Sequence, residues 1–107
     1  MTAVTESVIS EMVERLVREF DPLRIVLFGS HARGEATRHS DVDLLVVMPN
    51  DVDRRKAPVS MLVALADLPL AKDVVVTTPA EIARRGDLIG TVLRPALREG
   101  RVVHERG

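Results

Sequence analysis

Apolar side chains recur at helical spacing through the first twenty positions of the chain. They are Val8, Met12, Leu16 and Phe20, flanked by Ile9, Val13 and Val17. Charged residues fill much of the other side, as on the outer face of an amphipathic helix. The pattern predicts a helix over residues 4–20. Asp21-Pro22 ends it, because a residue that precedes proline is disfavoured in helical geometry.

Strand-like and helix-like segments alternate along the rest of the chain. The strand-like runs are residues 25–28, 41–47, 74–77 and 101–105. Helices are expected over residues 55–67, from residue 78 onward, and after Gly86 to about Glu99. Residues 30–40 are polar, with room for one helical turn. The order of segments predicts a small α/β layer architecture in a single domain over residues 1–107.

Three prolines refine the expected helices. Pro58 is comfortable only in a first turn and so limits where the second helix begins. Thr78-Pro79-Ala80-Glu81 combines a capping threonine, a first-turn proline and a glutamate placed to reach back to the cap. Pro95 is expected to kink the last helix or to end it early.

Composition excludes several classes of function. The chain contains no cysteine, so it has no disulfide, thiolate metal site or cysteine nucleophile. Fifteen basic and sixteen acidic residues give a formal net charge of -1, and there are only two aromatic residues, so long nucleic acid is not an expected partner. The apolar runs are too short to span a membrane of ~20 helical residues. We expect a soluble, cytoplasmic protein that does not associate with membranes.

Two carboxylates lie close together at the start of a predicted strand. Asp41 and Asp43 are two residues apart, so their side chains leave the same face of the strand while Val42 points to the other. Two negative charges at this spacing are unfavourable unless a positive charge lies between them. Oxygen ligands of this kind suit Mg²⁺ or Mn²⁺, and the pair is therefore a candidate metal site.

A glycine-serine turn follows the first predicted strand directly. Gly29 allows backbone N–H groups to approach an anion closely, and Ser30 adds a hydroxyl donor. A phosphate-binding turn next to paired carboxylates is typical of metal-assisted phosphoryl or nucleotidyl transfer.

The spacing of these residues resembles the motif of a known family. Gly29-Ser30, ten residues and then Asp41-Val42-Asp43 resembles the motif of the polymerase-β-like nucleotidyltransferases. The fuller runs Phe28-Gly29-Ser30-His31-Ala32-Arg33-Gly34 and Ser40-Asp41-Val42-Asp43-Leu44 resemble the minimal nucleotidyltransferase branch. The resemblance implies a small mixed β-sheet flanked by helices. Members of this branch commonly occur beside HEPN-domain proteins as toxin–antitoxin pairs.

The resemblance also implies roles for individual residues. A third carboxylate is expected on a later strand, where Asp73 matches and Asp67 is a poorer candidate. Asp41, Asp43 and Asp73 would then be catalytic and would hold two Mg²⁺ ions, or Mn²⁺. Gly29 and Ser30 would bind the phosphates of ATP, and Arg33 would either neutralise their charge or brace the turn.

The implied activity is transfer of AMP from ATP to a hydroxyl, expected to be a tyrosine, of a partner HEPN-type toxin. Two alternatives remain open. One is an antitoxin without catalysis that neutralises its partner by docking, and the other is a small-molecule nucleotidyltransferase similar to those that modify aminoglycosides.

Histidines and late arginines are given simpler interpretations. His31 and His39 are interpreted as solvated loop residues, with a phosphate contact as the alternative. The basic residues late in the chain are interpreted as a solvated helix face, with an acidic partner surface as the alternative. They are Arg84, Arg85, Arg94, Arg98, Arg101 and Arg106.

Overall fold

Five helices and four strands make up the described part of the chain. The computed structural model describes residues 3–37, 40–85 and 93–106. In chain order the elements are α1 (Ala3–Phe20), β1 (Arg24–Phe28), α2 (Ser30–Arg33), β2 (Val42–Val47), α3 (Lys56–Ala64), β3 (Lys72–Thr77), α4 (Pro79–Arg85), α5 (Leu93–Glu99) and β4 (Arg101–Glu105).

The four strands form one mixed sheet in the order β3-β2-β1-β4. β1 is antiparallel to both of its neighbours, β2 and β4, whereas β2 and β3 are parallel. Parallel neighbours need a long crossover connection, which α3 supplies. The expected α/β fold with a mixed sheet and flanking helices is therefore confirmed.

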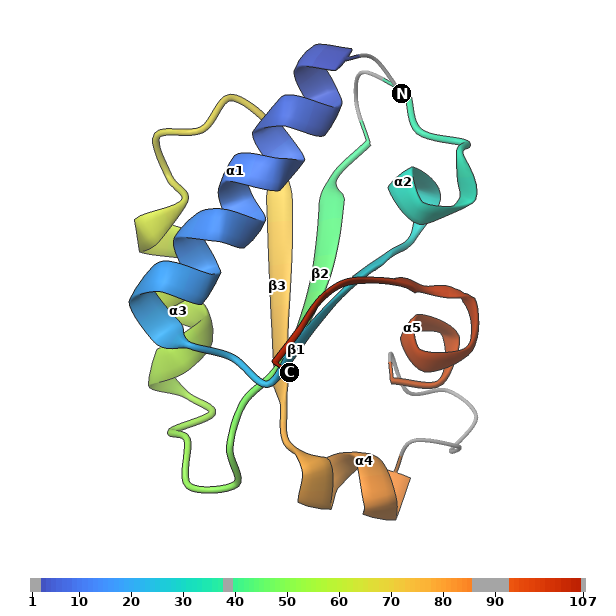
Figure 1. Cartoon of the computed structure of the whole chain (residues 1–107). Helices are drawn as coiled ribbons and strands as arrows, with labels where there is room; N and C mark the ends of the chain where they lie inside the picture. Colours follow the sequence, from blue (N-terminus) through green and yellow to red (C-terminus); the bar gives the residue numbers. More distant parts are fainter. Residues whose placement is uncertain (1–2, 38–39, 86–92, 107) are drawn as a thin grey trace.

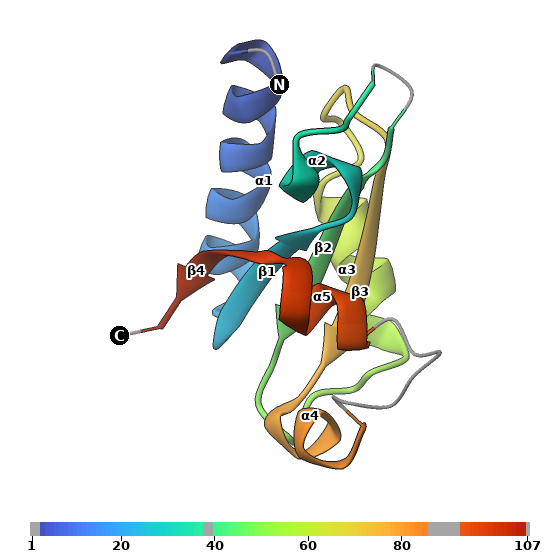
Figure 2. The same cartoon turned by 90° about the vertical axis from the view of Figure 1, so that its right-hand side faces the viewer.

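The two faces of the sheet are covered by different helices (Figure 1). α1 and α3 pack on one face, where Met12, Leu16, Leu44 and Met61 are fully buried. α5 packs on the other face, in a smaller cluster of Val26, Leu45, Leu93 and Ala96. Because side chains alternate along a strand, the even-numbered residues of β2 face α1 and α3, and the odd-numbered ones face α5. Figure 2 shows α1 and α5 on opposite sides of the strands.

α1 is amphipathic, as its sequence predicts. Ile9, Met12 and Leu16 are buried, while Val8 and Phe20 are partly buried against the same core. Among the described residues, no helix combines the length and the apolar character needed to cross a membrane.

Several element boundaries differ from those expected. α3 ends at Ala64 and is followed by turns, so the predicted helix over residues 55–67 was too long. β3 begins at Lys72, two residues earlier than expected, because it pairs with β2 from Val42 onward. α5 continues past Pro95 to Glu99, so the early end predicted there was wrong. Gly86 lies outside the described residues.

The predicted start of α4 is correct for its cap but not for its glutamate. The backbone N–H of Glu81 donates to the Thr78 hydroxyl at 3.2 Å, as a capping threonine requires. The Glu81 carboxylate was expected to reach back to the cap. It instead pairs with arginines, Arg84 at 2.7 Å among them.

Candidate active site

The turn between β1 and α2 has a backbone geometry that favours glycine. Gly29 has φ 74° and ψ −157°, a combination that side-chain-bearing residues rarely adopt. Its carbonyl oxygen accepts hydrogen bonds from the N–H groups of Ala32 at 3.1 Å and Arg33 at 3.2 Å. The turn therefore directs the chain sharply out of the sheet and into a single helical turn, which the polar segment was expected to contain.

Glycine is also required at this turn because a carboxylate occupies the space beside it. A Cβ atom added to Gly29 would lie 2.3 Å from Oδ2 of Asp43. The two residues are brought together because Phe28, the last residue of β1, pairs with Asp43 on β2. The sequence motif places these residues fourteen positions apart, and strand pairing puts them in contact.

Asp43 and Asp73 are direct partners on neighbouring parallel strands. Their Cα atoms occupy paired positions in the β2–β3 register, so both side chains lie on the sheet face that α5 packs against. Asp41 immediately precedes Val42, the first residue of β2. The structure thus brings the three predicted carboxylates to one end of two adjacent strands, next to Gly29.

Electrostatics at this end of the sheet are unfavourable for ionised carboxylates. The pKa of Asp43 is raised, first because the side chain is partly buried and then because Asp73 and Asp41 carry like charges. The positive charge of Arg33 offsets part of this effect. A further positive charge at the site would relieve the repulsion.

A divalent cation fits this site by its chemistry. Three carboxylates supply the oxygen ligands that Mg²⁺ and Mn²⁺ prefer, and their mutual repulsion is the cost that such an ion would remove. Within residues 3–37, 40–85 and 93–106, no three acidic or histidine side chains already stand in a ligating arrangement.

His31 is buried, so its interpretation as a solvated loop residue was wrong. The side chain is 4% exposed, and Nε2 lies 3.3 Å from the carbonyl oxygen of Ser40, just before Asp41. It thereby ties α2 to the chain that enters β2. The polar composition of residues 30–40 carries no signal for this burial. His39 lies outside the described residues.

Arg33 and Asp67, two other candidates from the sequence, lie in different surroundings. Arg33 is exposed and pairs with Glu35 at 3.2 Å, close enough to the carboxylates for its charge to act on Asp43. Asp67 pairs with Arg15 of α1, which covers the opposite face of the sheet. Asp67 is therefore not part of this group.

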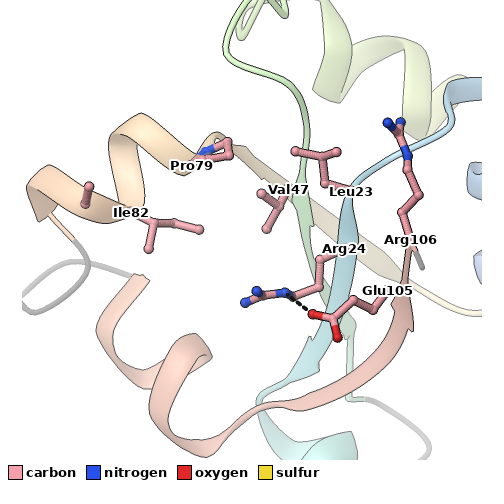
Figure 3. Close-up of a pocket in the computed structure, with 8 residues that line it drawn as sticks. Leu23, Arg24, Val47, Pro79, Ile82, Glu105 and Arg106 are labelled. Carbon is pink, nitrogen blue, oxygen red and sulfur yellow. Dashed lines mark hydrogen bonds and ion pairs between the residues drawn. The ribbon is translucent and has the colours of Figure 1, made fainter.

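A separate cavity of about 480 Å³ lies at the other end of the strands. Figure 3 shows it between the end of β2, the start of α4 and the C-terminal strand. Its lining comprises Leu23, Arg24, Val47, Pro79, Ile82, Ala83, Glu105 and Arg106. Within this lining, Arg24 and Glu105, which are paired on β1 and β4, form an ion pair at 3.0 Å. None of the predicted site residues contributes to this lining.

Comparison with known proteins links the fold and the motif. A Methanocaldococcus jannaschii protein assigned as a protein adenylyltransferase is 43% identical over 51 residues, which are 46% of this chain and 35% of that protein. The alignment thus spans about a third of that relative's length.

Solved structures show the same fold at lower identity. A protein from Sulfolobus solfataricus, assigned as a nucleotidyltransferase, has a TM-score of 0.61 and 22% identity over 99% of this chain and 90% of that chain. A toxin–antitoxin crystal structure with AMP-PNP has a TM-score of 0.54 and 24% identity over 90% of this chain and 73% of that chain.

The family assignment rests on a longer match. The nucleotidyltransferase domain family matches residues 9–97, which include the glycine turn, the three carboxylates and both strands that carry them. Because this match covers well over half of the chain, the protein belongs to the nucleotidyltransferase domain family.

Proposed function

We propose that this protein is an Mg²⁺-dependent protein adenylyltransferase that transfers AMP from ATP to a tyrosine hydroxyl of a partner HEPN-type toxin and thereby acts as its antitoxin. The observation that carries the proposal is the grouping of Asp41, Asp43 and Asp73 beside Gly29 at one end of two paired strands. The assigned activity of the archaeal relative and the toxin–antitoxin structure with AMP-PNP support it.

Each residue of the group has a role in this reaction. Gly29 leaves room for the Asp43 carboxylate beside the turn. The backbone of this turn and the Ser30 hydroxyl bind the phosphate oxygens. Asp41 and Asp43 hold the divalent ions, and Asp73 completes the site on the acceptor side. When bound, the ions neutralise phosphate charge and lower the pKa of the attacking hydroxyl. Arg33 contributes positive charge at the edge of the site.

The proposed reaction is a single displacement at the α-phosphorus of ATP. The acceptor oxygen forms a bond to the α-phosphorus of ATP, and the bond from that phosphorus to the oxygen that bridges the α- and β-phosphates breaks. Pyrophosphate leaves, and the proton of the hydroxyl passes through Asp73 to solvent. The site is built at the rim of the sheet, where an acceptor carried by another protein can reach it.

Intact-mass measurement tests the proposal. A candidate HEPN-type partner is incubated with this protein, ATP and Mg²⁺, and its mass is compared with that after incubation with an Asp41→Asn/Asp43→Asn variant. We expect additions of ~329 Da per AMP with the unaltered protein only, and none after chelation of the metal.

Two controls define the outcome. Urea unfolding of the variant shows whether it remains folded, and toxin activity is assayed in the same mixtures. If the partner stays unmodified while both versions of the protein neutralise it equally, the protein is a docking antitoxin and the proposed transfer is wrong.

A further inference from the structure

A buried glutamate on α4 gathers three arginines around it. Glu81 is 7% exposed, and its carboxylate lies 2.7 Å from Arg84, 3.3 Å from Arg54 and 3.5 Å from Arg85. Arg54 comes from the turn before α3, 27 positions before Glu81 in the chain. These four residues are called the Glu81 arginine cluster below. Of the late arginines noted in the sequence, only two belong to it.

The cluster carries an excess of positive charge. Three guanidinium groups face one carboxylate, so its formal net charge is +2. Burial opposes ionisation of Glu81, but the hydrogen bond from Arg84 and the arginine charges outweigh it, and the pKa of Glu81 is lowered. Each guanidinium has five N–H donors and touches Glu81 through one nitrogen. The side chains of Arg54, Arg84 and Arg85 are 48%, 69% and 61% exposed, so their other donors can be reached by an anion from solvent.

Two cavities open between these arginines. One, of about 490 Å³, is lined by the four residues of the cluster themselves. The other, of about 200 Å³, extends between Arg54 and Arg85 to Val75, Thr77 and Leu93. The Thr77 side chain is 1% exposed, and its hydroxyl has no hydrogen-bond partner among the described residues. The cavities give carboxylate side chains space to enter between the arginines.

The cluster lies on the same side of the sheet as the candidate active site. Thr77 follows Asp73 by four residues on β3, so both point to the face that α5 packs against. Four residues of strand separate them by about 13 Å. A protein that contacts both Asp73 and the cluster would have to extend over this distance along β3.

We propose that the Glu81 arginine cluster is a docking surface for an acidic segment of the protein acceptor, with aspartate or glutamate side chains entering between Arg54 and Arg85. This inference rests on the proposed function for its partner. Charge complementarity selects an anionic partner, and Glu81 preorganises the arginines so that less side-chain freedom is lost on binding. RNA, the other anionic macromolecule, is disfavoured by a chain with a net charge of -1 and two aromatic residues.

Calorimetric titration with the candidate HEPN-type partner tests the surface. An Arg54→Gln/Arg85→Gln variant removes the two cations that line both cavities, while Arg84, the nearest partner of Glu81, is kept. We expect the Kd for the partner to rise about tenfold. Arg18→Gln, an exposed arginine on α1 behind the opposite face, is the matched control and should leave the Kd unchanged.

Four further measurements make the test independent of how well the double variant folds. Urea unfolding is compared for all variants, and each single substitution, Arg54→Gln or Arg85→Gln, should raise the Kd by a smaller factor. The complex of the unaltered protein should weaken as salt rises from low to physiological concentration. An unstructured oligoribonucleotide serves as a competitor probe.

The outcomes test the docking surface and the proposed function separately. An unchanged Kd in the folded double variant, or no complex at all with the unaltered protein, overturns the docking surface. AMP transfer by the unaltered protein in that case leaves the proposed function in place. A salt-sensitive complex that depends on Arg54 and Arg85 but transfers no AMP keeps the surface and overturns the function. Tighter binding of the oligoribonucleotide at these arginines would identify an RNA site instead.

Discussion

Replacement of Gly29 by alanine tests the close contact on which the candidate site depends. The φ of 74° and ψ of −157° at this position cost a side-chain-bearing residue about 1–3 kcal/mol. The new Cβ would also lie 2.3 Å from Oδ2 of Asp43, which forces that carboxylate out of its rotamer at about 0.5–1.5 kcal/mol. Gly29→Ala should therefore lower the free energy of unfolding by about 2–4 kcal/mol.

Gly34 offers a matched control in the same motif. It also has a positive φ, 72°, but a Cβ added there would meet no atom within 4 Å. Its ψ of 19° lies in the ordinary left-handed region, so Gly34→Ala should cost about 1–2 kcal/mol from backbone geometry alone. Urea unfolding of both variants, monitored by circular dichroism, gives the comparison.

A double-mutant cycle separates the clash from the backbone strain. In an Asp43→Ala background the carboxylate is absent, so Gly29→Ala should cost about 0.5–1.5 kcal/mol less than in the unaltered protein. Displacement of Asp43 should also reduce AMP transfer about 100-fold, because small misplacements of catalytic groups are costly. Additive effects of Gly29→Ala and Asp43→Ala on stability would refute the contact.

Three further predictions concern charge and packing elsewhere. Because the pKa of Asp43 is raised in the folded state, metal-free stability should fall as pH rises through that pKa. Asp43→Asn should remove this fall in stability and stabilise the metal-free protein at pH 7 by less than about 1 kcal/mol. Urea unfolding in the presence of chelator that shows a lower stability for the variant would contradict this prediction. Because the pKa of Glu81 is lowered in the folded state, its contribution to stability should be present at neutral pH and lost as pH falls through that pKa. Glu81→Gln should therefore lower the urea midpoint at pH 7 and have less effect near pH 3. Equal effects at the two pH values would count against the ion pairs. A Cβ on Gly100 would lie 2.3 Å from the carbonyl oxygen of Ala96, so Gly100→Ala should cost about 1–3 kcal/mol in thermal unfolding, and an unchanged midpoint would exclude that crowding.

Local patterns in the sequence were enough to predict most of the elements. The 3.6-residue repeat from Val8 to Phe20 identifies α1, and the β-branched run after Asp41 identifies β2. Errors occurred where tertiary contacts decide an element's length. β3 begins early because its first residues pair with β2.

The sequence by itself determined which residues carry the candidate chemistry. Glycine, serine and carboxylate positions within one short window depend only on spacing along the chain, which the motif records. The third carboxylate, Asp73, was reached through resemblance to a family, since no local pattern connects it with Asp43.

Only the tertiary structure decided how distant residues meet. The β2–β3 register sets Asp43 opposite Asp73, the β1–β2 register sets Asp43 against Gly29, and α1 pairs with Asp67 on the far face. The same holds for Arg54 at Glu81. The periodicity of apolar residues predicts which face of its own helix or strand a residue occupies. Strand register and helix packing instead arise from the burial of many side chains at once. Contacts between elements therefore follow only from the folded chain.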